Sequence, residues 1–336
     1  MRRMLFLLLT SLLGLCGPGM APAQAGPRVV VVHSYNAEYV WVREINRGIQ
    51  ESLRGLNASI TTYYMDAQRD PDPGHLRAKG QEFLARIEAL KPQVVIAADD
   101  AAQEYLVAPF LKGRAQPQVI FCGVNAPVGT YGFPAENVSG VRERWHFREG
   151  FALLHKIKPS LQTVVLLSDD SPSASYVLDN LREDREQGLP PLPKLLKVVQ
   201  VHTYQEWQRA VRFQQTRSQS LALGMYHSLV DERTGKVVPA DTVSAWTNGV
   251  NRLPTLGFAD YAKGHGQMCG ILESGREQGA LAGGMARQVL TRGVRAGSLP
   301  VKINKQGIVL LNLKTAERLG VVIPFEIIQA AEIVVK

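Results

Sequence analysis

Polar and aromatic residues that could bind a ligand come directly after short apolar segments of the chain. Ser34 and Tyr35 follow one β-branched segment, and the acidic pair Asp99 and Asp100 follows another. In such positions a hydroxyl can meet a ligand carboxylate, and an aspartate can bind an amine or a hydroxyl. The structural alternative for Ser34 and for one of the two aspartates is a helix cap, because a segment of helical period comes next.

The same arrangement recurs farther along the chain. Asn125 carries an amide that both donates and accepts hydrogen bonds, and its alternative role is turn formation. In the second half we expect ligand contacts from Asp169, Tyr226 and Tyr261. Tyr39 and Trp41 can supply a flat aromatic wall that stacks on a planar or cationic ligand, with core packing as their alternative.

The sequence carries no motif of catalysis, metal binding or nucleotide binding. Asp66, Asp70 and Asp72 lack the further oxygen ligands and the distal glutamate of a calcium loop. The histidines show no His-Glu-x-x-His spacing, and neither a Gly-x-Ser-x-Gly elbow, a P-loop nor a Gly-x-Gly-x-x-Gly loop occurs. We therefore predict no enzymatic activity, no catalytic residue, no cofactor and no bound metal.

A net charge of +8 raises the possibility of a nucleic acid partner. Lysines and arginines are mixed with acids, as in 182–186, and no basic run is interleaved with aromatic residues. This distribution argues against nucleic acid binding. At most, the charge is expected to help attract anionic solutes.

Residues 1–25 have the pattern of a secretory signal peptide. Arg2 and Arg3 precede an apolar run of about twelve residues, shorter than the roughly twenty that a membrane span needs. Small residues at 23 and 25 predict cleavage near Ala25 and a periplasmic mature protein. Lipidation of Cys16 is disfavoured because Leu15 occupies the position where a small residue is needed.

Two cysteines remain after cleavage, Cys122 and Cys269. They can form a single bridge in an oxidising compartment or remain two buried thiols. The sequence leaves both alternatives open.

From residue 28 onward, short β-branched segments alternate with segments of helical period, which indicates βα units around parallel sheets. The mature length of roughly 310 residues favours two lobes over one core. A loop rich in Gly, Pro and Asn at 123–137 predicts a crossing between lobes near 138–141. A glycine-rich stretch at 264–270 indicates a hinge or a close approach of backbone segments. We predict lobes of 26–141 plus about 272–298, and of 142–271 plus about 299–336.

Several short motifs occur in order along nearly the whole mature chain: His33-Ser34-Tyr35, Ala-Ala-Asp-Asp-Ala at 97–101, Val-Ile-Phe-Cys-Gly-Val-Asn at 119–125, Gly140-Val141 with Glu143, and Leu-Asn-Leu-Lys-Thr-Ala at 311–316. In these motifs the chain resembles the ABC-transporter substrate-binding proteins of the tryptophan/tyrosine-binding type. It is also similar to the related periplasmic sensor regions of histidine kinases and diguanylate cyclases.

The resemblance implies an α/β, two-lobed type I periplasmic binding protein, in which each lobe is a parallel sheet flanked by helices and several hinge crossings join the lobes. Such a protein captures a small polar ligand in the interlobe cleft and delivers it to an ABC permease. The alternatives are a ligand-sensing subunit for a membrane receptor and, from another class, an exported hydrolase. No kinase or cyclase region follows before Lys336, which favours a stand-alone binding protein. We expect a monomer, and aromatic amino acids are suggested as ligands by analogy alone.

Overall fold

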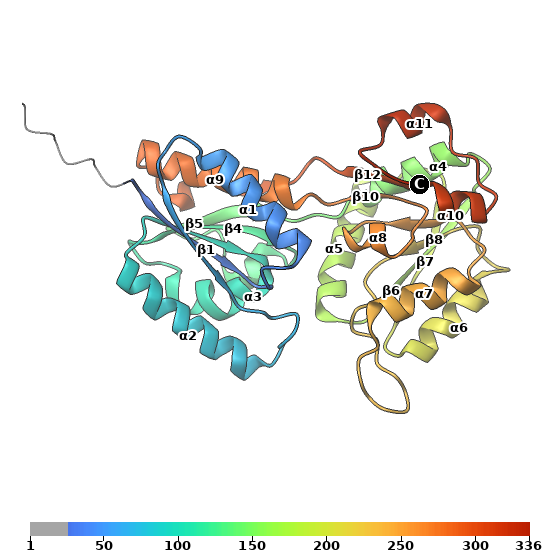
Figure 1. Ribbon diagram of the computed structural model, residues 1–336, viewed down its shortest axis with the longest axis horizontal. Coiled ribbons are helices and arrows are strands. Elements are labelled where there is room, and N and C mark those ends of the chain that lie inside the picture. Colours follow the sequence, from blue (N-terminus) through green and yellow to red (C-terminus); the bar gives the residue numbers. More distant parts are fainter. Residues whose placement is uncertain (1–25) are drawn as a thin grey trace, which may run out of the picture.

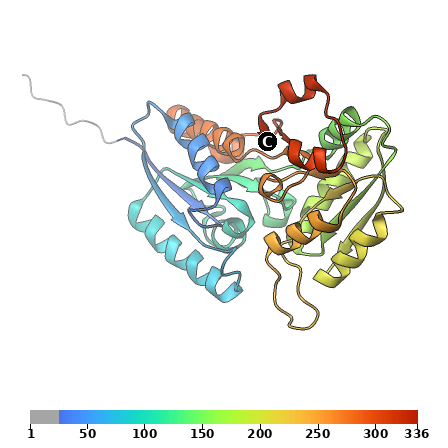
Figure 2. The same ribbon diagram turned by 45° about the vertical axis from the view of Figure 1, so that its right-hand side comes forward.

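In a computed structural model of the protein, residues 26–336 are placed well enough to be described. The predicted signal peptide lies outside the described residues. The described chain forms two lobes, each built on an open sheet covered by helices, as Figures 1 and 2 show from two directions. Among the described helices, none combines the length and the apolar character that crossing a membrane requires.

The first lobe is organised by a parallel sheet in the order β11-β5-β4-β3-β1-β2. Its strands are β1 (Arg28–His33), β2 (Ser59–Tyr64), β3 (Val94–Ala98), β4 (Gln118–Val124), β5 (Val138–Arg142) and β11 (Lys302–Ile303). The four valines of β1 are fully buried, as expected for a central parallel strand that is covered on both faces. A central strand has helices on both faces of its sheet, so all of its side chains are buried. The continuous β-branched runs of the sequence meet this requirement.

Helices pack on both faces of the first sheet. One face is covered by α1 (Val40–Leu53) and α9 (Gly275–Arg292). The other face is covered by α2 (Pro73–Leu90) and by a π-helix, η1 (Gln103–Leu111), which continues the short helix α3 (Asp99–Ala102). A short 3-10 turn, η2 (Val128–Tyr131), follows β4, and another, η3 (Ala296–Ser298), follows α9.

Helices α1 and α9 touch backbone to backbone, because glycines occupy their contact. A Cβ atom added to Gly48 would lie 2.2 Å from the carbonyl oxygen of Arg276, and one added to Gly279 would lie 2.0 Å from that of Ile45. At the start of α9, a Cβ on Gly275 would lie 2.9 Å from the carbonyl oxygen of Trp41. This contact fixes where α1 presents Trp41.

The second lobe has a sheet in the order β13-β12-β10-β9-β8-β6-β7. Its strands are β6 (Thr163–Asp169), β7 (Lys194–Val201), β8 (Leu221–Leu223), β9 (Thr255–Gly257), β10 (Cys269–Leu272), β12 (Ile308–Asn312) and β13 (Ile333–Val335). The pairing is parallel except between β10 and β12. One face carries α4 (Phe147–Ile157), α5 (Pro172–Gln187) and α10 (Leu313–Arg318), and the other carries α6 (Tyr204–Gln214) and α7 (Ala240–Val250). Short helices α8 (Tyr261–Gly264) and α11 (Phe325–Ala330) complete the lobe.

The first five strands of each lobe follow one spatial order, 2-1-3-4-5, counted within the lobe. In open sheets of this order, ligands bind outside the carboxyl ends of the strands, at the point between strands 1 and 3 where the winding reverses. In this chain those points lie after β1 and β3 in the first lobe, and after β6 and β8 in the second. The carboxyl ends of the strands of both sheets therefore face the space between the lobes.

The chain passes between the lobes three times, at 143–146, at 273–274 and at 304–307. The stretch at 138–141, predicted to be a crossing, is instead part of β5, and the first crossing follows it. The predicted boundary near 298 lies before β11, which pairs with β5, so the third crossing follows Ile303. The glycine-rich stretch at 264–270 leads into β10, a strand that the sequence pattern missed.

The two cysteines are free and buried, Cys122 in β4 of the first sheet and Cys269 in β10 of the second. Each belongs to the apolar core of its own lobe. Of the two alternatives that the sequence leaves open, the structure therefore has two buried thiols.

Candidate functional site

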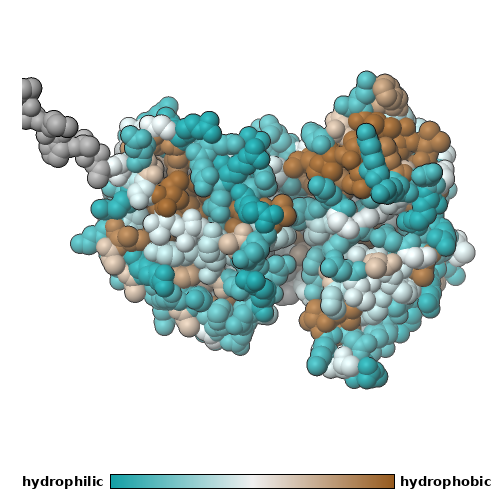
Figure 3. Space-filling model, viewed as in Figure 1, coloured by the Kyte–Doolittle hydropathy of each residue, from teal (hydrophilic) through white to brown (hydrophobic). Residues whose placement is uncertain are grey.

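A cavity of about 330 Å³ lies between the lobes, at the carboxyl ends of the strands. Residues that follow strands of the first sheet and line it are Tyr35, Asp99, Asp100, Asn125 and Glu143. Residues that follow strands of the second sheet and line it are Ser173, Met225, Ala259 and Glu273. Figure 3 shows the recess between the two lobes from outside. The volume lies at the lower end of the range of roughly 300–1,000 Å³ that is usual for ligand pockets.

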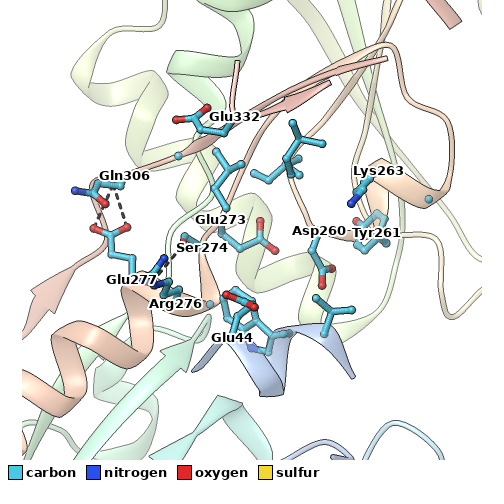
Figure 4. Close-up of a pocket in the computed structure, with 18 of the residues that line it drawn as sticks. Glu44, Asp260, Tyr261, Lys263, Glu273, Ser274, Arg276, Glu277, Gln306 and Glu332 are labelled. Carbon is cyan, nitrogen blue, oxygen red and sulfur yellow. Dashed lines mark hydrogen bonds between the residues drawn. The ribbon is translucent and has the colours of Figure 1, made fainter. Parts of the chain in front are cut away.

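A larger, more open hollow of about 1540 Å³ adjoins this cavity beside the hinge. Figure 4 shows its lining, in which the carboxyl groups of Asp260 and Glu273 face the same space. Tyr39, Trp41, Tyr261 and Glu273 line both hollows and so form a shared wall. We take the smaller cavity as the candidate site, because the carboxyl ends of both sheets converge on it.

Asp99 is held at the floor of the cavity by groups from two neighbouring elements. Trp41 Nε1 donates a 2.7 Å hydrogen bond to Asp99 Oδ1. Gly123, whose φ of +65° suits glycine, leaves room for this carboxyl group, since an added Cβ would lie 2.7 Å from the same oxygen. The side chain is only 2% exposed, and its second oxygen, Oδ2, has no hydrogen-bond partner among the described residues.

Asp100, by contrast, uses both oxygens within the protein. Oδ1 accepts hydrogen bonds from the backbone N–H of Ala126 at 3.1 Å and from the hydroxyl of Tyr131 at 2.9 Å. Oδ2 accepts one from the backbone N–H of Asn125 at 3.1 Å. Asp100 therefore shapes the loop after β4, and Asp99 is the aspartate with a free oxygen.

Asn125 and Glu143 form the next part of the lining. Asn125 Nδ2 donates a 3.3 Å hydrogen bond to Glu143 Oε2, and Asn125 Oδ1 is left without a partner. Glu143 is only 4% exposed and lies in the first crossing. The pair joins the loop after β4 to the hinge.

The hinge side of the cavity is formed by Glu273 in the second crossing. Glu273 is 7% exposed, and its Oε2 atom has no partner among the described residues. Beside it, the hydroxyl of Tyr39 in the first lobe donates a 3.3 Å hydrogen bond to Asp260 Oδ1 in the second lobe. This bond connects the lobes across the shared wall.

The three crossings are bound to one another by polar contacts. Asn304 in the third crossing accepts a 2.8 Å hydrogen bond from the backbone N–H of Arg144 in the first, and donates to its carbonyl oxygen at 3.0 Å. The carboxylate of Glu277, which follows the second crossing, accepts hydrogen bonds from the backbone N–H groups of Lys305 and Gln306. The crossings therefore form one connected hinge.

The carboxyl groups of the cavity have raised pKa values. Burial raises the pKa of Asp99 well above its ordinary value, and the charge of Asp100 adds to this, against the hydrogen bond from Trp41. Burial likewise raises the pKa values of Glu143 and Glu273 well above the ordinary value, and nearby carboxyl groups raise them further. Among the described residues that line the cavity there is no Lys, Arg or His. The basic chain thus carries an acidic cleft, which does not fit the expected attraction of anionic solutes.

Six of the residues predicted to bind a ligand line the cavity: Tyr35, Trp41, Asp99, Asp100, Asn125 and Tyr261. Ser34, Asp169 and Tyr226 do not. Ser34 Oγ donates to the carbonyl oxygen of Ala98 and accepts from the backbone N–H of Ala102. These bonds hold α3 against β1. The capping alternative is wrong, because the helix that follows Ser34, α1, has Tyr39 at its N-cap and no side-chain cap bond.

Asp169 is fully buried, and both its oxygens are used. Oδ1 accepts hydrogen bonds from the N–H and Oγ of Ser171, and Oδ2 accepts one from the N–H of Ser228. Its carboxylate therefore fixes the start of α5 and the loop after β8. It has no oxygen left for a ligand.

Tyr226 lies in the core of the second lobe and is only 1% exposed. Its hydroxyl contacts Nδ1 of His265 at 2.7 Å, and Nε2 of the same ring contacts Asp241 Oδ1 at 2.9 Å. This Tyr-His-Asp chain is arranged like a hydrogen-bond relay, but burial raises the pKa of Tyr226 and Gln267 also donates to its oxygen. A substrate has no access to this hydroxyl, so the chain of contacts is structural.

Several lining residues escaped the prediction, among them Tyr131, Trp145, Tyr176 and Glu273. Glu273 follows β10, whose four residues gave no periodic signal. Tyr176 projects from within α5 and Tyr131 from a 3-10 turn, so neither follows a strand. Two further lining residues had a signal in the sequence: Glu143 as part of a resembling motif, and Tyr39 as an aromatic residue close to Trp41.

The comparisons with known proteins agree with this architecture. A family model described as ABC transporter substrate binding protein matches residues 38–335. The search among curated proteins finds no match.

Three solved structures show the similarity in fold. The ligand-free, open structure of a substrate binding protein with adhesive properties from Clostridium difficile is 16% identical at a TM-score of 0.68, over 92% of this chain and 99% of that one. The ABC domain in complex with L-Trp from Streptococcus pneumonia is 17% identical at a TM-score of 0.64, over 91% and 100%. A periplasmic ribose ABC transporter protein from Conexibacter woesei is 18% identical at 0.53, over 88% and 95%.

At these identities the solved structures show the fold, and they confirm the predicted type I periplasmic binding protein architecture. The family model spans nearly the whole described chain. The chain belongs to the ABC transporter substrate binding protein family.

Proposed function

We propose that the mature protein is a monomeric, non-enzymatic, periplasmic solute-binding protein that captures a small polar ligand between its lobes and delivers it to an ABC permease. The observation that carries this proposal is the interlobe cavity, which both sheets line with the residues that follow their strands. A ligand there contacts both lobes at once only when the cleft is closed. Binding therefore favours the closed form by the free energy of those added contacts.

The connected hinge supports the same proposal. Hydrogen bonds of Asn304 and Glu277 connect the three crossings, so the lobes can rotate about one region only. Rotation about one region is the usual geometry of hinge closure around a ligand. The Tyr39–Asp260 hydrogen bond adds an interlobe contact that depends on the angle between the lobes. An ABC permease would bind the closed form selectively, through a surface to which both lobes contribute.

Solution scattering tests closure. The solute that co-purifies with the protein is identified by mass spectrometry, removed by partial unfolding and refolding, and then added back. We expect one solute per chain and a smaller radius of gyration at saturation. A radius that stays unchanged when binding is complete would contradict a closing cleft. Uptake of this solute by cells that lack the protein tests delivery, and unimpaired uptake would argue against the transport role.

A further inference from the structure

The cavity presents more hydrogen-bond acceptors than the protein satisfies. Asp99 Oδ2, Asn125 Oδ1 and Glu273 Oε2 are buried oxygens without a partner in residues 26–336, and all three side chains line the cavity. Asp99 and Glu273 are each more than nine-tenths buried. A buried acceptor without a donor costs about 1–3 kcal/mol and is rare in native proteins, so each needs an explanation.

Four donors of the same lining are used within the protein. Trp41 Nε1 is bound to Asp99, Tyr131 to Asp100 and Tyr39 to Asp260, and the Tyr261 hydroxyl is bound to the Gly224 carbonyl. Tyr35, Ser173, Tyr176 and Trp145 carry further donors in this lining, so the donors alone do not select a ligand. The buried acceptors without a partner are what call for N–H or O–H donors on the ligand.

The charge of the lining restricts the chemical class of the ligand further. Asp99, Asp100, Glu104, Glu143 and Glu273 all line the cavity, and no basic residue of the part of the chain that the structure describes accompanies them there. A ligand carboxylate or phosphate would be placed beside these groups without a counter-charge. A neutral polyol could occupy the acceptors but would leave the buried carboxyl groups without an opposite charge, whereas a cation supplies both donors and charge.

Aromatic rings make up much of the remaining wall, including Tyr35, Trp41, Trp145 and Tyr176. Their faces attract organic cations, and the attraction grows as water is excluded. Rings are not ligands for inorganic cations, which need a shell of oxygens. Among the described residues no cluster of His, Cys, Asp or Glu is arranged to hold a metal ion.

We propose that the cleft binds a small organic cation that carries N–H donors, such as a protonated amine or a guanidinium group, and that has no carboxylate or phosphate. This inference rests on the proposed function, because it names the class of solute that the cleft captures. Asp99 and Glu273 provide the free carboxylate oxygens, and the aromatic wall holds the body of the ligand. A zwitterionic amino acid fits less well, because its carboxylate finds no cation in the lining.

Matched pairs of compounds that differ by one carboxylate test this inference. Tryptamine is compared with tryptophan and agmatine with arginine, within a panel of mono-, di- and polyamines, choline, neutral polyols and Ca²⁺. Thermal shifts rank the compounds, and calorimetry gives affinities. We expect an amine of the panel to bind at least about tenfold more tightly than its amino acid counterpart, and choline, which lacks N–H donors, to bind less well than the best amine.

Variants then test whether the ligand binds at Asp99 in the cavity. Asp99→Asn should lower the affinity of the best amine about ten- to a hundredfold, because it removes the charge of a buried oxygen that the ligand contacts. Asp170→Asn is the matched control, because Asp170 is exposed, lies outside the cavity lining and pairs with His202. It should leave the affinity unchanged. Thermal melts of both variants without ligand check that they fold.

The outcomes separate this inference from the proposed function. Tighter binding of the amino acid member of each pair, of a polyol or of Ca²⁺, with closure, would overturn the cationic ligand and leave the solute-binding function in place. Failure of every amine in the panel would overturn it too. Amine binding without closure, and with equal affinity in the Asp99→Asn variant, would overturn both the proposed function and this placement.

Discussion

Replacing Glu273 by glutamine is expected to weaken solute binding and, at the same time, to raise the melting temperature of the ligand-free protein. Glu273 is buried in the second crossing with an unpartnered oxygen, and its pKa is raised by burial and by Asp260. Glutamine keeps the shape, cannot ionise at any pH, and brings an N–H group that can donate to Asp260. We expect a gain in the free energy of unfolding of about 1–3 kcal/mol, the usual size of the penalty for an unsatisfied buried group.

The loss in affinity should be of the same order. A hydrogen bond to a charged group contributes about 1.5–3 kcal/mol, which corresponds to about ten- to a hundredfold in the dissociation constant. Thermal unfolding without ligand and calorimetric titration measure the two effects. Glu326→Gln is the control, because Glu326 is exposed on α11 and distant in sequence from the hinge. A lower melting temperature in Glu273→Gln would show that the carboxyl group stabilises the hinge, contrary to this account.

Solute binding is expected to release protons and to strengthen as the pH rises above about 6.5, the ordinary pKa of histidine. In the ligand-free cleft, burial and mutual repulsion raise the pKa values of Asp99, Glu143 and Glu273, so these groups hold protons at a pH where free carboxyl groups are ionised. A bound cation favours their ionised forms and lowers those pKa values. Binding must then expel protons, and a higher pH favours the complex.

The neighbouring groups support this sign. Asp99 is faced by Asp100, Glu143, Tyr35 and the Cys122 thiol, and Glu273 is faced by Asp260, Glu143, Tyr39 and Tyr261. No cationic group is among them. Calorimetry in buffers of different ionisation enthalpy measures the number of protons exchanged. Proton uptake, or the same heat in every buffer, would contradict the expected linkage.

The same pKa shifts determine how the stability of the ligand-free protein depends on pH. An acid whose pKa is raised in the folded state binds more protons folded than unfolded, so its contribution is fully present below about pH 4 and is lost as the pH rises toward the raised pKa. His33 and His227 act in the opposite direction, because burial lowers their pKa values to about 4. Their contribution to the free energy of unfolding is therefore lost as the pH falls below about 6.5. The window above pH 6.5 therefore isolates the carboxyl groups.

Much of the first lobe's share of the site was predictable from the sequence. A β-branched run that is buried on both faces becomes a parallel strand, and the residue after it lies at the ligand-binding edge of the sheet. This reasoning brought Tyr35, Asp99, Asp100 and Asn125 to one cavity. It does not give the direction of a side chain, which depends on backbone partners from other elements. Ser34 is the clear example, since its hydroxyl is occupied by Ala98 and Ala102, which lie far along the chain.

The acids of the hinge were harder to predict, because the crossings depend on tertiary pairing. The segment 138–141 is a strand because it pairs with β4 and β11. In the sequence it only follows a loop, with no pattern that distinguishes a strand from a crossing. Strand β10 has four residues, which is too short for a periodic signal, and it is defined by its pairing with β9 and β12. Glu143 and Glu273 acquire their positions from these pairings. Their meeting in one cavity could not be inferred from spacing along the chain.

Native mass spectrometry of gently purified protein tests most directly the central claim that a solute is held between the lobes. The wild-type protein should carry one small molecule per chain, and exact mass should identify a nitrogen-containing cation. The double variant Asp99→Asn, Glu273→Gln, prepared identically and at least as stable, should have lost that molecule, whereas Asp170→Asn should retain it. Equal retention of the molecule by the double variant would contradict a ligand site in the interlobe cleft.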